Sequence, residues 1–139
     1  MNITLERLDD DFHLRATNED GLTLDFDGSA AIGGHDRGFR PMQSVLAAVG
    51  ACSSIDVILL LRKQRQQLDG LRIELSAERR DEAPRIFTKI HVHYILSGQL
   101  DAKKVERACR LSMEKMCSVS LMLKAGGVDI SWSTEVVPS

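Results

Sequence analysis

The chain has 139 residues, of which 43% are hydrophobic and 27% charged, and its formal net charge is −2. This length and composition predict one globular domain over residues 1–139, with a small core that dimerisation would help to complete. The even charge balance and the few aromatic residues argue against nucleic-acid binding. No apolar stretch follows a positive flank at the N-terminus, so no secretory signal is predicted and a cytoplasmic location is expected.

The first third of the chain has the pattern of short strands separated by turn residues. Strands are predicted over Met1–Leu8, Phe12–Thr17 and Leu22–Phe26, with acidic and glycine-containing turns between them. A glycine-rich loop follows over Asp27–Arg40. Loops of this length are often functional.

A long apolar helix is predicted from Pro41 to about Leu68, where Asp69-Gly70 would end it. Ser44–Leu61 carries one charge, Asp56, and is almost long enough to span a membrane. Glycine, serine and aspartate in the middle of the segment argue against a span. A buried core helix has the same composition.

The second half predicts a hairpin, two helical segments and a final strand. Leu71–Glu78 and Ile86–Tyr94 alternate between apolar and polar residues. Asp101 would cap a helix whose apolar face includes Val105, Ala108, Cys109, Ser112 and Met116. A bend is expected near Cys117, then helix to Lys124 and a strand over Val128–Val136. This order of elements indicates an α+β fold with antiparallel sheet.

Three cysteines are too few for a disulfide framework, so Cys52, Cys109 and Cys117 are expected to be thiols at rest. Cys52 lies with Val45, Val49 and Leu59 on one helical stripe, and such a cysteine can simply pack as a small apolar residue. Cys117 follows a helix boundary, where a helix N-terminus can favour the thiolate. Cys109 is expected in the core. Spacing alone leaves a functional and a packing role for the Cys52–Cys117 pair equally open.

Other kinds of site have weak support. His91 and His93 share a strand face with Lys89, but the sequence places no acid or cysteine beside them, so no metal site is predicted. Gly33-Gly34 matches no phosphate-binding pattern, and no serine–histidine–acid motif is visible. No cofactor is expected.

Three segments together resemble the OsmC/Ohr superfamily. RPMQSVLAAVGACSSIDV (Arg40–Val57) is similar to its central-helix signature, and MEKMCSVSLML (Met113–Leu123) to its second cysteine motif. ERRDEAPRIFTKIHVHY (Glu78–Tyr94) resembles the hairpin of the YhfA-like branch. The resemblance covers almost the whole chain.

This resemblance implies an OsmC-like fold: antiparallel sheets around a long central helix, in an intertwined homodimer with a site at each end of the interface. It also implies thiol-dependent reduction of a small organic hydroperoxide. In that role Cys52 would attack the peroxide, Cys117 would form a disulfide with it, and an external dithiol would reduce the pair.

The sequence departs from the peroxidase branches at the residues that activate the cysteine. Met42 stands where those branches have a glutamate, and Phe12, with Arg15 nearby, where they have an arginine. Arg37 and Arg40 are candidate replacements that would bind substrate or thiolate, with Gln43 as an uncharged orienting group. Two alternatives stay open: a module that binds a small ligand in an apolar pocket, and a redox sensor acting through a partner.

Overall fold

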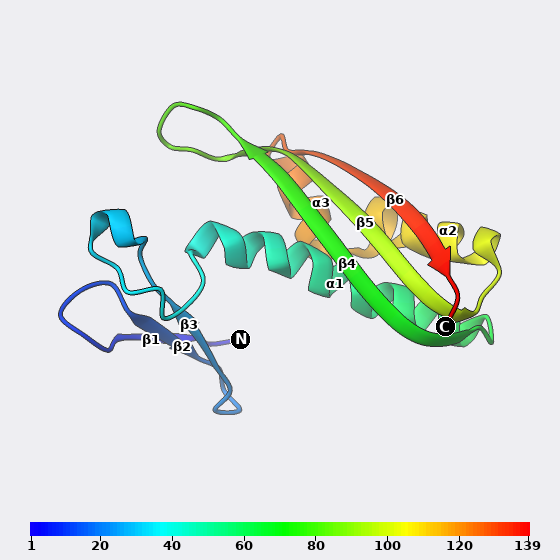
Figure 1. Ribbon diagram of the computed structural model, residues 1–139, viewed down its shortest axis with the longest axis horizontal. Coiled ribbons are helices and arrows are strands. Elements are labelled where there is room, and N and C mark those ends of the chain that lie inside the picture. Colours follow the sequence, from blue (N-terminus) through cyan, green and yellow to red (C-terminus); the bar gives the residue numbers. More distant parts are fainter. The chain divides into compact units, whose positions relative to one another are not determined.

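The structure is a computed structural model that describes residues 1–139. The chain divides into two compact units, Met1–Val45 and Leu46–Ser139. The boundary between them falls inside the helix α1 (Pro41–Lys63). Each unit contains one three-stranded sheet, and the helices longer than one turn begin at Pro41 or later, which confirms the predicted α+β class (Figure 1).

The first unit is an antiparallel meander of β1 (Thr4–Arg7), β2 (Leu14–Thr17) and β3 (Thr23–Phe26). The three predicted strands are confirmed, but each is shorter than predicted. The turns between them include residues on both sides of the acidic clusters. The following loop contains one short turn of helix, η1 (Ala30–Ile32).

One face of this first sheet is apolar and open. Its side chains, with those from the first turn of α1, border a hollow of about 610 Å³ lined by Ile3, Leu5, Leu14, Ala16, Asn18, Leu22, Thr23, Leu24, Phe26, Pro41, Ser44 and Val45. Leu5 and Leu24 keep more than half of their surface exposed, at 55% and 51%. The first unit therefore presents apolar surface that its own residues do not cover.

Helix α1 ends five residues earlier than the sequence predicts, so the expectation that Asp69-Gly70 stops it is wrong. Arg65 takes a left-handed conformation with φ 56°. Its N–H donates to the Arg62 carbonyl, and the Gln66 N–H donates to the Leu61 carbonyl, which is the Schellman pattern of a helix end. Asp69-Gly70 instead lies at an irregularity within the next strand.

Within the second unit, α1 buries one narrow stripe of residues at steps of four: Val49, Ser53, Val57 and Leu61. Gly50 lies beside this stripe, where a Cβ would be 2.7 Å from Leu75 Cδ1, so glycine allows the helix to approach the sheet closely. By length and composition alone α1 could also cross a membrane, but core helices of soluble proteins pass the same test.

The second sheet has the order β4-β5-β6, with strands Gln67–Arg79, Phe87–Gln99 and Asp129–Val137. The predicted antiparallel pairing of β4 and β5 is confirmed. The expectation of purely antiparallel sheet is wrong for β6, which runs parallel to β5. The reason is the helical crossover of residues 100–128, which returns the chain to the end of the sheet where β5 begins.

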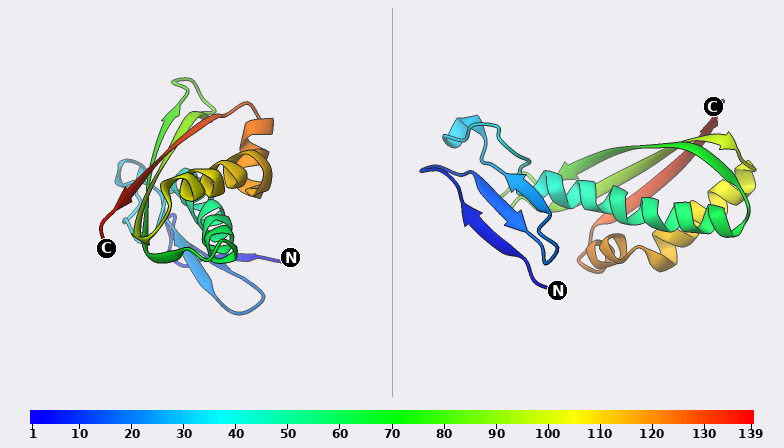
Figure 2. Two further views of the ribbon diagram at one scale, coloured as in Figure 1. Left: turned by 90° about the vertical axis from the view of Figure 1, so that its right-hand side faces the viewer. Right: turned by 90° about the horizontal axis from the view of Figure 1, so that it is seen from below.

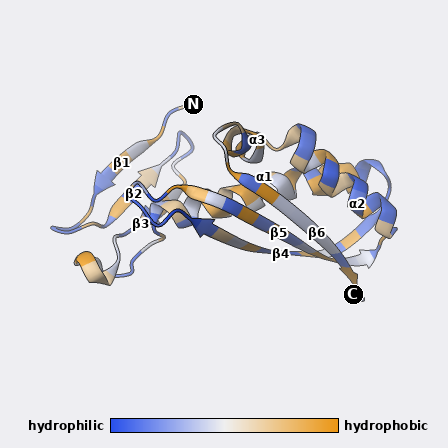
Figure 3. Ribbon diagram, turned by 90° about the horizontal axis from the view of Figure 1, so that it is seen from above, coloured by the Kyte–Doolittle hydropathy of each residue, from blue (hydrophilic) through white to orange (hydrophobic).

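The core of this unit lies on the inner face of β5, where Ile90, Val92, Tyr94 and Leu96 are at most 1% exposed. Apolar and polar residues alternate along the strands of this sheet (Figure 3). Near the hairpin, the buried positions of β5 shift from even-numbered to odd-numbered residues, so that Phe87 rather than Ile86 is buried. A register shift between Glu78 and Arg79 adds one residue to β5 there.

The crossover consists of α2 (Ala102–Leu111), a single π-helical turn, η2 (Ser112–Met116), and α3 (Ser118–Ala125). The Asp101 carboxylate accepts hydrogen bonds from the backbone N–H groups of Lys103 and Lys104, which confirms the predicted cap. In the second unit the helices lie on the same face of the β4-β5-β6 sheet and leave the other face open (Figures 1 and 2).

Candidate functional site

Cys52 lies in α1 beside the buried stripe and is half-buried. The stripe predicted to contain Val49, Cys52 and Leu59 is only partly correct, because Leu59 is 48% exposed while Ser53 and Val57 are buried. The buried face is rotated toward Ser53, and this leaves Cys52 at its edge. At the edge of the core, a thiol is held in place and still reachable from outside.

Cys117 is fully buried, and the π-helical turn η2 puts it there. Its backbone N–H donates to the Ser112 carbonyl, five residues earlier, at 2.7 Å. The extra residue in this turn moves Met116 outward, to 41% exposure, and gives Cys117 the inward position. The expected bend near Cys117 is confirmed, and the expected place of Met116 on the apolar face is wrong. Single π turns are frequent at functional sites.

The Cys117 thiol is also the N-cap of α3, where Sγ accepts hydrogen bonds from the Ser120 N–H at 3.4 Å and the Ser120 Oγ at 3.1 Å. Burial raises the pKa of the Cys117 thiol, the two Ser120 contacts oppose that rise, and the neighbouring Cys52 side chain adds to it. The start of α3 therefore favours the thiolate as expected, but burial outweighs this effect and the net pKa of Cys117 is raised.

The Cys52 side chain is one of the causes of the raised Cys117 pKa, so the two predicted cysteines lie in the same neighbourhood. All three cysteines are free thiols. Cys109 is fully buried, as expected for a core residue, and burial raises its pKa to about 12. Cys109 is therefore held as the neutral thiol.

A buried polar network lies beside the thiols, and sequence reasoning did not find it. The Ser53 hydroxyl contacts the Tyr94 hydroxyl and, at 2.8 Å, the Ser112 hydroxyl, which donates to Asp56 Oδ2 at 3.0 Å. Tyr94 has a raised pKa, caused first by burial, with Cys109 and Cys117 among its neighbours. Asp56 lies three residues after Ser53 and four after Cys52, a helical spacing that could have been a signal.

The three polar residues expected to bind substrate, Arg37, Arg40 and Gln43, lie in the first unit. Arg37 Nη1 is 3.7 Å from Asp9 Oδ2, and its backbone N–H donates to Asp27. Arg40 Nη2 donates to Asp36 Oδ1 at 2.6 Å. The Gln43 side chain accepts from the Arg40 N–H at 3.0 Å, which is half of a capping box at the start of α1.

Two further clusters in the first unit were not predicted. Asp25 accepts two hydrogen bonds from Arg15, at 2.7 and 3.0 Å, and contacts His13 Nε2 at 2.9 Å. These partners, Arg15 first, hold the pKa of Asp25 well below its usual value. The neighbour of Arg15 on the next strand is Asp25 by register, but no sequence pattern indicates that register.

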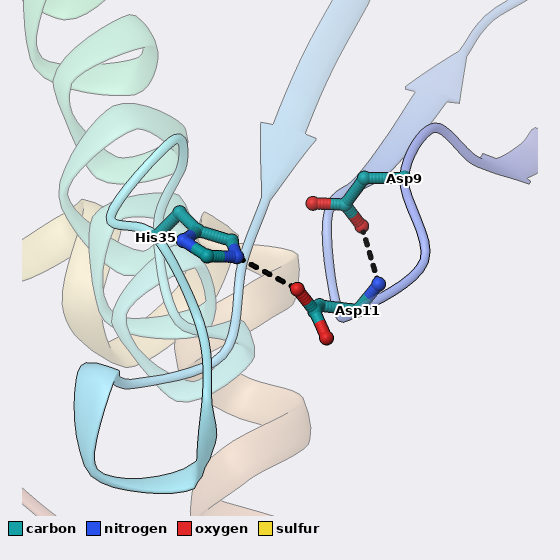
Figure 4. Close-up of side chains that lie close together, drawn as sticks. All are labelled: Asp9, Asp11 and His35. Carbon is teal, nitrogen blue, oxygen red and sulfur yellow. Dashed lines mark hydrogen bonds and ion pairs between the residues drawn. The ribbon is translucent and has the colours of Figure 1, made fainter.

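The second cluster is Asp9, Asp11 and His35, whose ligand atoms lie within 4.8 Å of one another (Figure 4). His35 Nε2 contacts Asp11 Oδ2 at 2.7 Å, and Asp9 Oδ1 accepts from the Asp11 N–H. Asp9 Oδ2 is buried without a hydrogen bond. The Arg37 guanidinium, 3.7 Å from that oxygen, supplies a positive charge beside it.

Comparison with known proteins gives a match to a family model. Residues 34–133 match the model described as OsmC-like protein. Protein YhfA of Escherichia coli strain K12 is 48% identical over 103 residues, which are 73% of this chain and 76% of that protein.

Solved structures extend the likeness to nearly the whole chain. A hypothetical protein from Aquifex aeolicus VF5 superposes with a TM-score of 0.81 at 30% identity, covering 98% of this chain and 96% of that one. The organic hydroperoxide resistance protein OhrB of Bacillus subtilis superposes with a TM-score of 0.62 at 23% identity, covering 96% of each chain.

Proposed function

The chain belongs to the OsmC-like protein family, and on that premise we propose that it reduces small organic hydroperoxides through Cys52 and Cys117. One observation carries the proposal: the half-buried Cys52 lies close enough to the buried Cys117 to raise its pKa, and both are free thiols. The hydroperoxide resistance of the B. subtilis relative of the same fold supports the choice of substrate.

The reaction divides between the two thiols according to their exposure. The Cys52 thiolate attacks the terminal oxygen of ROOH, the O–O bond breaks, and Cys52 becomes a sulfenic acid. The departing RO⁻ takes up a proton equivalent to the one that the thiol released on ionising, and leaves as ROH. The Cys117 sulfur then attacks the Cys52 sulfur, and the departing hydroxide combines with the Cys117 proton to form water. An external dithiol reduces the disulfide and is itself oxidised. These steps need thiols alone and no cofactor.

The buried thiol suits the second step better than the first. A raised pKa keeps Cys117 protonated and slow toward peroxide, so oxidant meets Cys52 first. The Ser120 hydroxyl, 3.1 Å from Cys117 Sγ, is placed to stabilise the thiolate when that proton leaves. Cys52 needs its own positive charge for the first step, and we propose Arg37 or Arg40, with Gln43 as a fixed neighbour of the latter.

Thiol titration of the wild type and of variants in which one cysteine is replaced by serine tests this reaction. With cumene hydroperoxide, wild-type protein is expected to lose two thiols as one intramolecular disulfide, and Cys52→Ser to lose none. Cys117→Ser is expected to stop at a Cys52 sulfenic acid that dimedone traps. Cys109→Ser is the matched control, since it removes a buried thiol outside the pair and should behave as wild type.

The proposal fails if Cys52→Ser consumes peroxide as fast as wild type, or if the disulfide forms with Cys109. Hydrogen peroxide in place of cumene hydroperoxide measures the preference for an organic substrate, which is expected to be at least about tenfold. Separate replacement of Arg37 and Arg40 by alanine identifies the activating charge, because loss of a nearby cation raises a thiol pKa and slows attack at pH 7.

A second candidate function is the binding of a small apolar ligand. The open hollow of about 610 Å³ on the first sheet, bordered largely by aliphatic side chains, is the observation that favours it. Pockets of 300–1,000 Å³ are typical of small-molecule sites. Binding of a fluorescent fatty-acid analogue that is lost in Leu24→Asp, and unaffected by Cys52→Ser, would support this function.

A further inference from the structure

The open face of the second sheet carries a row of polar side chains from its two parallel strands. His91 and His93 lie on β5, opposite Ser131 and Ser133 of β6, and Glu135 follows two residues later. The sequence alone placed the histidines on one face with no acid beside them. The parallel register of β6 supplies the acid, because it brings Glu135 within 3.2 Å of His93 Nε2.

Each imidazole has one nitrogen held by its own hydrogen-bond partner, and its second nitrogen faces an atom that both rings share. His91 Nδ1 is 2.7 Å from Ser131 Oγ, and His93 Nε2 is 3.2 Å from Glu135 Oε2. The remaining nitrogens, His91 Nε2 and His93 Nδ1, lie 2.9 and 2.7 Å from the same atom, Ser133 Oγ. The two rings thus converge on one position above the sheet.

The hydrogen-bond partners allow both converging nitrogens to be lone-pair donors. An ionised Glu135 accepts but cannot donate, so it fixes the proton of neutral His93 on Nε2 and leaves Nδ1 free. The Ser131 hydroxyl can accept as well as donate, so His91 can carry its proton on Nδ1 and leave Nε2 free. A histidine whose outer N–H is held by a carboxylate or hydroxyl is the usual arrangement of a metal ligand.

We propose that His91 and His93 form a two-histidine site for a divalent transition-metal ion of the nickel, copper and zinc group. The ion would sit between His91 Nε2 and His93 Nδ1, at about 2.0–2.1 Å from each, with the Ser133 hydroxyl rotated aside and water completing the coordination. Imidazole nitrogen suits these ions better than magnesium or calcium, which prefer oxygen ligands.

The charges around the site favour a cation. Lys89 is the one positive side chain beside the histidines on β5, and the register places it between Glu78 of β4 and Asp129 of β6. Glu74 of β4 lies opposite His93, but Arg72 Nη2 is 3.2 Å from its Oε1, so this ion pair adds no net charge. His93 is 29% exposed, so an ion can reach the site while the ring stays in a fixed orientation.

Isothermal titration of NiCl₂ into the reduced wild-type protein tests the site. Saturable binding of one ion per chain is expected, with paramagnetic broadening of backbone NMR signals centred on β5 and β6. His91→Gln and His93→Gln should each weaken binding at least tenfold, and Glu135→Gln about tenfold through His93. His35→Gln is the control for the other cluster of possible ligand atoms, Asp9, Asp11 and His35, and should leave the affinity unchanged.

Two results would overturn the proposal. One is nickel binding of equal strength in wild type and in folded His91→Gln and His93→Gln, as judged by unchanged circular dichroism. The other is loss of binding in Cys52→Ser or Cys117→Ser with no effect of the histidine substitutions, which would place the ion at the thiols. Because the readout is binding alone, neither result depends on hydroperoxide reduction.

Discussion

Burial sets the properties of the individual thiols. Cys109 and Cys117 have no exposed surface, and both have raised pKa values. From the sequence, Cys109 could be assigned to the core because its helical face is apolar. The burial of Cys117 could not be predicted, because it depends on one extra residue in a helical turn that no residue pattern marks.

The raised thiol pKa values predict a loss of stability at alkaline pH. The unfolded chain ionises its cysteines near pH 8.5, whereas the folded state keeps Cys109 protonated to about pH 12. The free energy of unfolding should therefore fall as pH rises above 8.5, by up to about 1.4 kcal/mol per pH unit for each such group. Urea denaturation at pH 7 and pH 10 measures this slope.

Cys109→Ala should make that alkaline slope shallower, even though it lowers stability at pH 7 by leaving a small cavity. Val105→Ala is the matched control, because it also empties volume on the buried face of α2 but removes no titrating group. Equal slopes in the two variants would mean that Cys109 does not contribute.

In the first unit, the lowered pKa of Asp25 predicts the opposite pH dependence, a loss of stability at acid pH. Its folded pKa is depressed, chiefly by Arg15, so its contribution to stability is present above the unfolded value of about 3.9 and is lost as pH falls below it. Asp25→Asn should lower the denaturation midpoint at pH 7, and the difference from wild type should shrink at pH 3. A difference that persists unchanged at pH 3 would assign the effect to packing rather than charge.

At the scale of elements, the sequence predicted which segments form helices and strands better than where they end. The apolar run from Pro41 and the alternation of the hairpin identified α1, β4 and β5. The end of α1 was missed because Arg65, and not a glycine, takes the left-handed position. The direction of β6 was also missed, since pairing partners are chosen by tertiary contacts that one strand's pattern does not contain.

The close approach of α1 to β4 predicts different outcomes for two substitutions at Gly50. Gly50→Ala gains helix propensity of about 1 kcal/mol, and the one atom that its Cβ approaches too closely is the end of the flexible Leu75 side chain. Its stability should stay within about 1 kcal/mol of wild type. Gly50→Leu should lose about 1–3 kcal/mol, because it overpacks the helix–sheet contact. Thermal denaturation of both variants checks this, and equal stabilities would show that the contact is loose.

At the scale of the whole molecule, the chain leaves much apolar surface uncovered. In the 23-residue helix α1, the buried residues are Val49, Gly50, Ser53, Val57 and Leu61. Ile55 and Leu59, one turn apart on this helix, are 61% and 48% exposed. A soluble monomer rarely exposes large apolar patches, and α1 is a helix that a second chain could cover.

We therefore predict a tight homodimer, whose interface should bury more than about 2,000 Å². Light scattering at micromolar concentration should give twice the mass of the chain. Ile55→Lys together with Leu59→Lys should shift the protein toward monomer or aggregate, whereas Lys63→Glu, an exposed charge change in the last turn of α1, should not. A wild-type monomer would contradict the prediction.

The parallel pairing of β6 has a consequence for the order of events during synthesis. The hairpin of β4 and β5 leaves the ribosome before residues 100–128 and before its third strand. Until β6 emerges, the central strand of the finished sheet is an edge, with unpaired backbone groups and an apolar inner face. During this interval the growing chain therefore has an additional strand edge open to strand-to-strand aggregation, and β5 loses that edge only when β6 docks.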